Sequence, residues 1–144
     1  HKVADAIERA VDIPLLHIAD PTAAAIKAAG HSTVGLLGTR FTLKQAFYHD
    51  RLVSKHGLNV IVPDDADRAI VHRVIYEELC LGEICDESRD EYRRIMANLV
   101  DRGAQAIILG CTEISLLVSA SDATVPLFDT TRLHAEGAAK ACLG

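Results

Sequence analysis

The chain has 144 residues, of which 49% are hydrophobic and 24% are charged, and its formal net charge is −5. This composition is typical of a folded globular domain and excludes an intrinsically disordered chain. The acidic balance lacks the basic face that binding to nucleic acid or to an anionic membrane requires. No apolar run is long enough to cross a membrane and the first residues do not form a signal peptide, so we expect a cytoplasmic protein with a small-molecule partner.

Short apolar runs alternate with helical patterns along the whole chain. This alternation predicts an α/β fold, with a parallel sheet of about four to five strands and helices on both faces. The predicted strands lie near Leu15 to Ile18, Val34 to Leu37, Val60 to Val62, Ala106 to Leu109 and Val125 to Phe128. The predicted helices lie near Lys2 to Val11, Thr22 to Ala29, Leu43 to Lys55, Asp67 to Leu79, Asp86 to Arg102 and Thr131 to Leu143.

The predicted helix 86–102 shows the clearest periodicity. Its apolar residues recur at steps of three and four, which places them on one face toward the sheet and leaves the charges in water. They are Tyr92, Ile95, Met96, Leu99 and Val100. Gly103 is expected to end this helix.

Three predicted turns follow strands and lead into helical segments. In an open parallel sheet the carboxyl ends of the strands meet at one edge, where the chemistry of such folds collects. We therefore expect the three turns to lie together. They are Gly38-Thr39-Arg40, Gly110-Cys111-Thr112-Glu113 and Asp129-Thr130-Thr131.

Cys111 is the leading catalytic candidate, because an apolar strand delivers its thiol to a turn before a helical segment. The positive end of a helix can lower the pKa of a cysteine and favour the thiolate. Glu113 acts in the opposite direction and would raise that pKa, unless it takes and returns the cysteine proton. Thr112 could donate a hydrogen bond to a substrate carboxylate. Judged by residue type alone, Cys111 would more often be a small buried hydrophobe.

The remaining candidates each have a plainer structural interpretation. Thr39 follows a glycine after a strand and is often only a turn or cap residue in that position. Arg40 could attract a carboxylate, although a loop arginine is usually solvated, and His134 on a C-terminal helix usually packs or caps. The four cysteines lack C-x-x-C spacing and the histidines lack ligand spacing, so we expect free thiols and no metal.

The stretch from Ile107 to Ile114, with its G-C-T-E core, resembles the second cysteine signature of the aspartate/glutamate racemase superfamily. Further matches occur in order over nearly the whole chain. They are V-G-L-L-G-T-R-F-T at 34–42, Phe47-Tyr48, Glu77-Glu78-Leu79, Gly82, Ser88-Arg89 and V-P-L-F-D-T-T at 125–131 with His134. The resemblance implies an amino-acid racemase without a cofactor, in which two α/β lobes hold the substrate and each supplies one cysteine.

The resemblance also implies roles for the site residues. Cys111 would be one acid/base, with Glu113 as its proton acceptor, and Thr39 and Thr112 would help to bind the α-carboxylate of aspartate or glutamate. Arg40 and His134 are further candidates for substrate contacts. We expect the full-length protein to be a homodimer.

The family's first cysteine signature, C-x-N-T, would lie before His1 and is not in this sequence. Residues 25–121 would then form the second lobe, whereas residues 1–24 and 122–144 would belong to the first. We therefore expect little or no racemase activity from this chain alone. Relatives often bind an acidic side chain through a basic residue of the second lobe; Arg89 is available, but an arginine at a helix start is usually solvated.

Two alternatives remain open. A cofactor-independent decarboxylase of the same superfamily would need only the second cysteine, and a glycine in place of the first one would favour it. A non-catalytic amino-acid-binding fragment would bind the ligand without exchanging its α-proton.

Overall fold

A four-stranded parallel sheet forms the centre of the computed structural model, which describes residues 3–44 and 46–143. Its strands are β1 (Thr33–Leu37), β2 (Asn59–Ile61), β3 (Ala106–Leu109) and β4 (Leu127–Asp129), in the order β2-β1-β3-β4. All three neighbouring pairs are parallel. The predicted α/β fold with a parallel sheet is therefore confirmed.

Helices occupy most of the chain outside the strands. They are α1 (Ala4–Ala10), α2 (Ala19–Ala28), α3 (Arg40–Lys44), α4 (Ala46–Asp50), the π-helical turn η1 (Arg51–Lys55), α5 (Asp65–Glu77), α6 (Asp86–Asp101), α7 (Ile114–Leu117) and α8 (Thr130–Leu143). Short 3-10 turns, η2 (Leu79–Leu81) and η3 (Ala120–Asp122), follow α5 and α7. Lys2 and Gln45, which two of the predicted helices include, lie outside the described residues.

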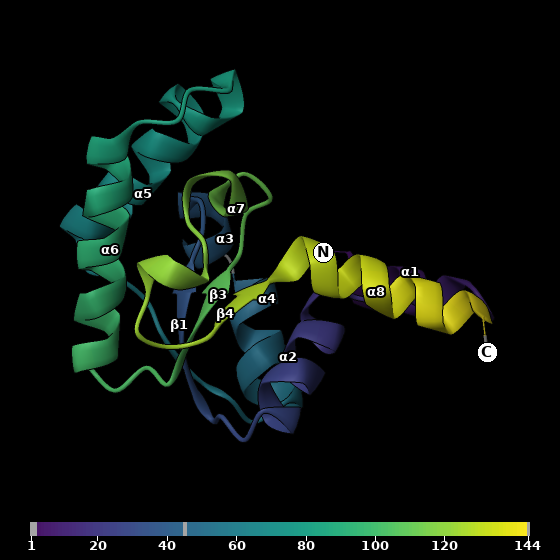
Figure 1. Ribbon diagram of the computed structural model, residues 1–144. Helices are drawn as coiled ribbons and strands as arrows, with labels where there is room; N and C mark the ends of the chain where they lie inside the picture. The colour runs from purple at the N-terminus through teal and green to yellow at the C-terminus, as the bar shows by residue number, and fades with distance from the viewer. Residues whose placement is uncertain (1–2, 45, 144) are drawn as a thin grey trace.

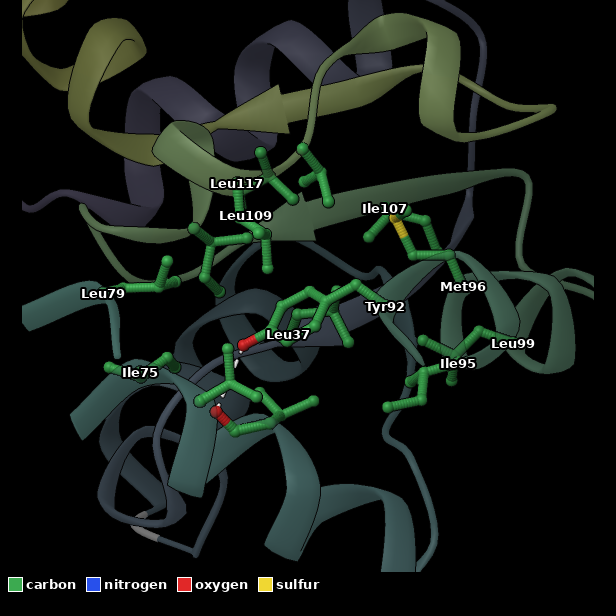
Figure 2. Close-up of a cluster of buried hydrophobic side chains, with 14 of the residues drawn as sticks. Leu37, Ile75, Leu79, Tyr92, Ile95, Met96, Leu99, Ile107, Leu109 and Leu117 are labelled. Atoms are coloured by element: carbon green, nitrogen blue, oxygen red, sulfur yellow. Dashed lines mark hydrogen bonds between the residues drawn. The ribbon is translucent and has the colours of Figure 1, made fainter. Parts of the chain in front are cut away.

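Helices α5 and α6 cover one face of the sheet (Figure 1). Tyr92, Ile95, Met96 and Leu99 of the predicted stripe lie in a buried cluster with Leu37 of β1 and Ile107 of β3, and Figure 2 shows Tyr92 at its centre. Val100, the fifth predicted residue, is only partly buried. The Tyr92 hydroxyl donates a hydrogen bond of 3.1 Å to the carbonyl of Val71 on α5. Because the only polar atom of this ring has a partner, the ring is buried without an unsatisfied group.

Helices α2 and α4 and the turn η1 cover the opposite face, so the sheet has helices on both sides, as predicted. Ile26 of α2 and Leu52 of η1 are fully buried there against Leu36 of β1 and Ile108 of β3. Strands β1 and β3 are therefore covered on both faces, which explains why they are continuous apolar runs in the sequence.

The predicted strand Leu15 to Ile18 is wrong. The described strands form one four-stranded sheet that does not include this segment, and its end instead winds into α2. His17 Nδ1 accepts the backbone N–H of Ala19 at 3.1 Å, and the Thr22 hydroxyl donates to the carbonyl of Ile18 at 3.0 Å. These side-chain bonds begin α2 three residues earlier than the sequence indicated.

Three other elements differ from the predictions in detail. The predicted helix 43–55 is divided into α3, α4 and the π-helical turn η1. Strand β4 begins two residues later than predicted, and the helical segment expected after Cys111 is the short helix α7 of four residues.

Helices α1 and α8 extend away from the sheet (Figure 1). Their described residues include one buried side chain in each helix, Ala4 in α1 and Thr130 in α8. Among the described helices, none is long and apolar enough to cross a membrane.

Candidate active site

The three segments predicted as turns meet at the carboxyl edge of the sheet. The register pairs Leu37, the last residue of β1, with Leu109, the last residue of β3, and pairs Leu109 with Asp129, the last residue of β4. The turns that begin with Gly38 and Gly110 therefore start beside the first residue of α8, Thr130. The three predicted segments lie together as expected, but Asp129 ends β4 and Thr130 and Thr131 belong to α8, so the third is not a turn.

Cys111 lies in the middle segment of the three, because β3 is the strand between β1 and β4. Its side chain is half-buried and packs against the cluster under α6. The thiol donates a hydrogen bond of 2.9 Å to Glu113 Oε2, and the Thr112 hydroxyl donates to the same oxygen at 2.6 Å. One carboxylate oxygen thus holds both neighbouring side chains.

This arrangement keeps Cys111 protonated. Burial, together with the hydrogen bond to the Glu113 carboxylate, raises the pKa of the Cys111 thiol to about 12. The hydrogen bonds from Cys111 and Thr112 lower the pKa of Glu113, which therefore stays ionised. The expectation that a helix start would favour the thiolate is not met: α7 begins only at Ile114 and has four residues, too few to build a strong positive end.

Thr39 and Arg40 form the neighbouring turn. The Thr39 hydroxyl lies 3.2 Å from the Thr42 hydroxyl and accepts the Thr42 backbone N–H at 3.3 Å. Thr39 therefore caps α3, which is the plainer interpretation that the sequence offered. Arg40 is exposed, and its backbone N–H donates to His72 Nδ1 at 3.3 Å.

His134 lies elsewhere, on the second turn of α8. It lines a hollow of about 160 Å³ with residues of α1 and of the segment before α2, among them Ile7 and His17. Neither Cys111 nor Thr39 lines this hollow. The His134 Nδ1 atom is buried and has no hydrogen-bond partner. Burial and, to a smaller extent, the charge of Arg51 lower the pKa of His17, which lines the same hollow, to about 4.

Two residues that were not among the predicted catalytic or substrate-binding residues hold the backbone on either side of Cys111. Thr130 Oγ1 donates to the carbonyl of Leu109 at 2.9 Å, before the turn. Arg89 Nε donates to the carbonyl of Leu117 at 2.8 Å, after it, and the Arg89 guanidinium also pairs with Asp86. A motif shows which residue types are present, but it does not show which carbonyl a side chain reaches.

Within residues 3–44 and 46–143, no group of three or more histidine, cysteine or acidic side chains is placed to hold a metal ion. All four cysteines are free thiols.

The family model described as Asp/Glu/Hydantoin racemase matches residues 1–138. The crystal structure of a putative Asp/Glu racemase from Yersinia pestis is 60% identical, has a TM-score of 0.96, and is matched over 100% of this chain and 63% of that one. An aspartate racemase homologue from Pyrococcus horikoshii OT3 is 32% identical with a TM-score of 0.91 and the same two coverages. A glutamate racemase from Roseiflexus sp. (strain RS-1) is 32% identical over 116 residues, which are 81% of this chain and 41% of that protein. The chain thus spans less than two thirds of the length of each of these three proteins.

Proposed function

This chain belongs to the Asp/Glu/hydantoin racemase family, and we propose that it supplies one of two acid/base cysteines to an amino-acid racemase acting on aspartate or glutamate. The observation that carries the proposal is the Cys111 thiol, half-buried at the carboxyl edge of the sheet and hydrogen-bonded to an ionised Glu113. The proposal concerns a longer cytoplasmic protein, active as a homodimer and without a cofactor.

The protonation state of Cys111 suits one half of the reaction. Racemisation removes the α-proton from one face of the substrate and returns a proton to the other face. A neutral Cys111 would donate its proton to the planar carbanion and become a thiolate, while a second thiolate on the opposite side would have taken the α-proton. In the reverse direction the Cys111 thiolate would be the base.

Glu113 makes that base stronger. A thiol beside a carboxylate releases its proton less readily than an isolated thiol, and its thiolate is therefore the stronger base. The same effect raises the pKa of Cys111. An α-proton is only weakly acidic, so a base of raised pKa lowers the energy gap for its removal. With the pKa of Glu113 lowered and that of Cys111 raised, the proton stays on the sulfur, so Glu113 would accept it only as a hydrogen bond and would not take it up.

The other proposed residues differ in how well their positions fit. Thr112 is next to Cys111, and Thr39 lies on the adjacent turn, so both can face a carboxylate placed at this edge. Arg40 follows Thr39 and is exposed, which would let it attract an acidic substrate. His134 fits least well, because its ring lies in the hollow between α1 and α8.

A single thiol reaches only one face of a carbanion. We therefore propose that this chain by itself does not racemise amino acids and that the second cysteine comes from the part of the longer protein that this chain does not cover.

Hydrogen exchange into the substrate tests the proposal. L- and D-aspartate and glutamate are incubated in deuterated water with the longer protein, and deuterium at Cα is followed by NMR. We expect exchange of both enantiomers, its loss in Cys111→Ser and its retention in Cys142→Ser, whose exposed thiol is the matched control. Exchange that continues unchanged in Cys111→Ser would remove this thiol from the mechanism.

The neutral thiol also favours one alternative, a decarboxylase in which Cys111 alone protonates a carbanion. Loss of CO2 from a substituted malonate leaves such a carbanion beside the remaining carboxylate. Release of CO2 that depends on Cys111, without α-proton exchange in aspartate or glutamate, would select this function over the racemase.

A further inference from the structure

Thr130 occupies the junction between β4 and α8, and its hydroxyl contacts β3. It is the first residue of α8 and only 3% exposed. Its Oγ1 donates a hydrogen bond of 2.9 Å to the carbonyl of Leu109, which is the last residue of β3 and lies two positions before Cys111.

The Thr130 hydroxyl is not needed to begin α8. Asp129 Oδ1 already accepts the backbone N–H groups of Thr131 at 2.9 Å and of Arg132 at 3.2 Å. This is the arrangement of an N-cap residue, which satisfies the free N–H groups of the first helical turn. The hydroxyl of Thr130 therefore stabilises the end of β3, which is distant in sequence, and does not cap its own helix.

The chain before Cys111 is held from the other side as well. The Gly110 N–H donates to the carbonyl of Leu37 on β1 at 2.8 Å. A side chain at this position would place its Cβ only 2.6 Å from that same oxygen, so β1 and β3 approach closely at this position because residue 110 is glycine. Leu109 is thus held by Thr130 at the start of α8, and Gly110 is held by β1.

We propose that Thr130 is a positioning residue for Cys111: its buried hydroxyl holds the end of β3 and so sets where the thiol meets Glu113. The pairing of β3 with β4 ends at Leu109 and Asp129, and this hydroxyl adds a hydrogen bond where the strands separate. The role in catalysis rests on the proposed function, whereas the role in holding the thiol does not.

The thiol itself reports on this role. In a chain with Cys80→Ser, Cys85→Ser and Cys142→Ser, Cys111 is the remaining thiol, and its alkylation by iodoacetamide is measured against pH by mass spectrometry. Thr130→Val removes the hydroxyl and keeps the shape of the side chain. We expect the midpoint of alkylation to fall by about one pH unit, because a displaced thiol loses part of its contact with Glu113.

Two variants control the measurement. Thr130→Ser keeps the hydroxyl and is expected to restore the original midpoint. Thr131→Val makes the same change on the next residue, which is exposed, and is expected to leave the midpoint unchanged. An unchanged midpoint in Thr130→Val, or the same shift in Thr131→Val, would overturn the proposal.

A second measurement covers the case in which the valine variant does not fold. Thr130 donates to Leu109 in the structure, so its hydroxyl proton should exchange slowly with water and be visible by NMR in the unmodified chain. A rapidly exchanging hydroxyl proton would overturn the proposal without any variant.

Turnover in the longer protein separates this proposal from the proposed function. Thr130→Val is expected to lower kcat about tenfold and to leave KM within about twofold, because a misplaced acid/base weakens the chemical step and not the binding of the substrate. If neither the unmodified longer protein nor its Thr130→Val variant exchanges the α-proton of the substrate, the proposed function fails. The alkylation result still decides the role of Thr130 in holding the thiol.

Discussion

The sheet and the terminal helices of this chain differ in how completely they bury their apolar side chains. Leu99 of α6 and Ile107 of β3 are 0% exposed, as are most side chains of the two clusters on either side of the sheet. In contrast, Ile7 of α1 is 42% exposed and Leu143 of α8 is 87% exposed. The sheet with α2 to α7 therefore has a core of its own, whereas α1 and α8 present apolar surface that nothing in the described chain covers.

This difference supports the proposal that the terminal segments belong with another lobe in a longer protein. Residues 25–121 were expected to form the lobe described here, but Ala19 and Ala23 of α2 are buried in its cluster, so packing favours an N-terminal boundary before α2. At the C-terminal side, β4 pairs with β3, so the hydrogen-bonded sheet favours a boundary after Asp129 rather than before it.

Truncating one core side chain should show the largest difference between the two regions. We expect Leu99→Ala to lower the free energy of unfolding by about 2–5 kcal/mol, because it leaves a cavity between α6 and the sheet. Ile7→Ala, the matched change on α1, should cost less than about 0.5 kcal/mol, since this side chain already contacts water. Urea denaturation measures both values, and equal losses would contradict the comparison.

The charged contacts should follow the same division. Asp20 of α2 accepts two hydrogen bonds of 2.8 Å from the Arg51 guanidinium and lies 2.8 Å from His56 Nε2. We expect Asp20→Asn to cost about 1–3 kcal/mol, because it removes the closer of the two carboxylates from the largely buried Arg51 charge.

Glu8 of α1 provides the control for this charge change. It lies 3.4 Å from Arg51 at an exposed position, so Glu8→Gln should change stability by less than about 0.5 kcal/mol. If the glutamate variant loses as much stability as the aspartate variant, α1 is held more firmly than the structure indicates.

The junction between the two regions should be sensitive to acid. The pKa of His17 is lowered from 6.5 to about 4 in the folded chain. Between these pH values the His17 ring is therefore mostly neutral in the folded chain and mostly protonated in the unfolded chain. Its stabilising contribution is complete above pH 6.5 and is lost as the pH falls toward 4, by about 1–3 kcal/mol. The lowered pKa of Asp20 adds its own loss only below that group's ordinary value of 3.8. His17→Asn should make the free energy of unfolding depend less on pH between pH 7 and 4. The same change at the more exposed His49 should leave this pH dependence as it is.

The smallest effect on stability is expected at the site. Glu113→Gln removes the negative charge beside Cys111, so the pKa of the thiol should fall from about 12 while the free energy of unfolding stays nearly unchanged. Alkylation of Cys111 against pH measures the shift. A midpoint that does not move would mean that burial alone sets the thiol pKa.

Local sequence patterns correctly predicted the elements that are buried on both sides. They failed for a segment whose structure depends on whether a neighbouring strand pairs with it. The runs at 34–37 and 106–109 are strands as predicted, and the stripe of α6 faces the sheet, because burial on these elements repeats with the period of the backbone. The run Leu15 to Ile18 is apolar apart from His17, but a strand also needs a paired neighbour, which an apolar pattern does not reveal.

The position of the site was predictable, but its chemical state was not. The three predicted segments lie at the ends of three strands of one parallel sheet, and this topology alone brings Thr39 and Cys111 to one edge. The protonation of Cys111 depends on how burial, the short helix α7 and the 2.9 Å contact with Glu113 add up. The sequence contains every one of these groups without giving their distances.

The two outer strands of the sheet, β2 and β4, have three residues each. An outer strand leaves one row of N–H and C=O groups free to pair with another molecule, and long rows promote aggregation. Rows this short offer an incoming strand very few bonds. The chain can therefore resist growth into extended sheets in solution even while the apolar sides of α1 and α8 are uncovered.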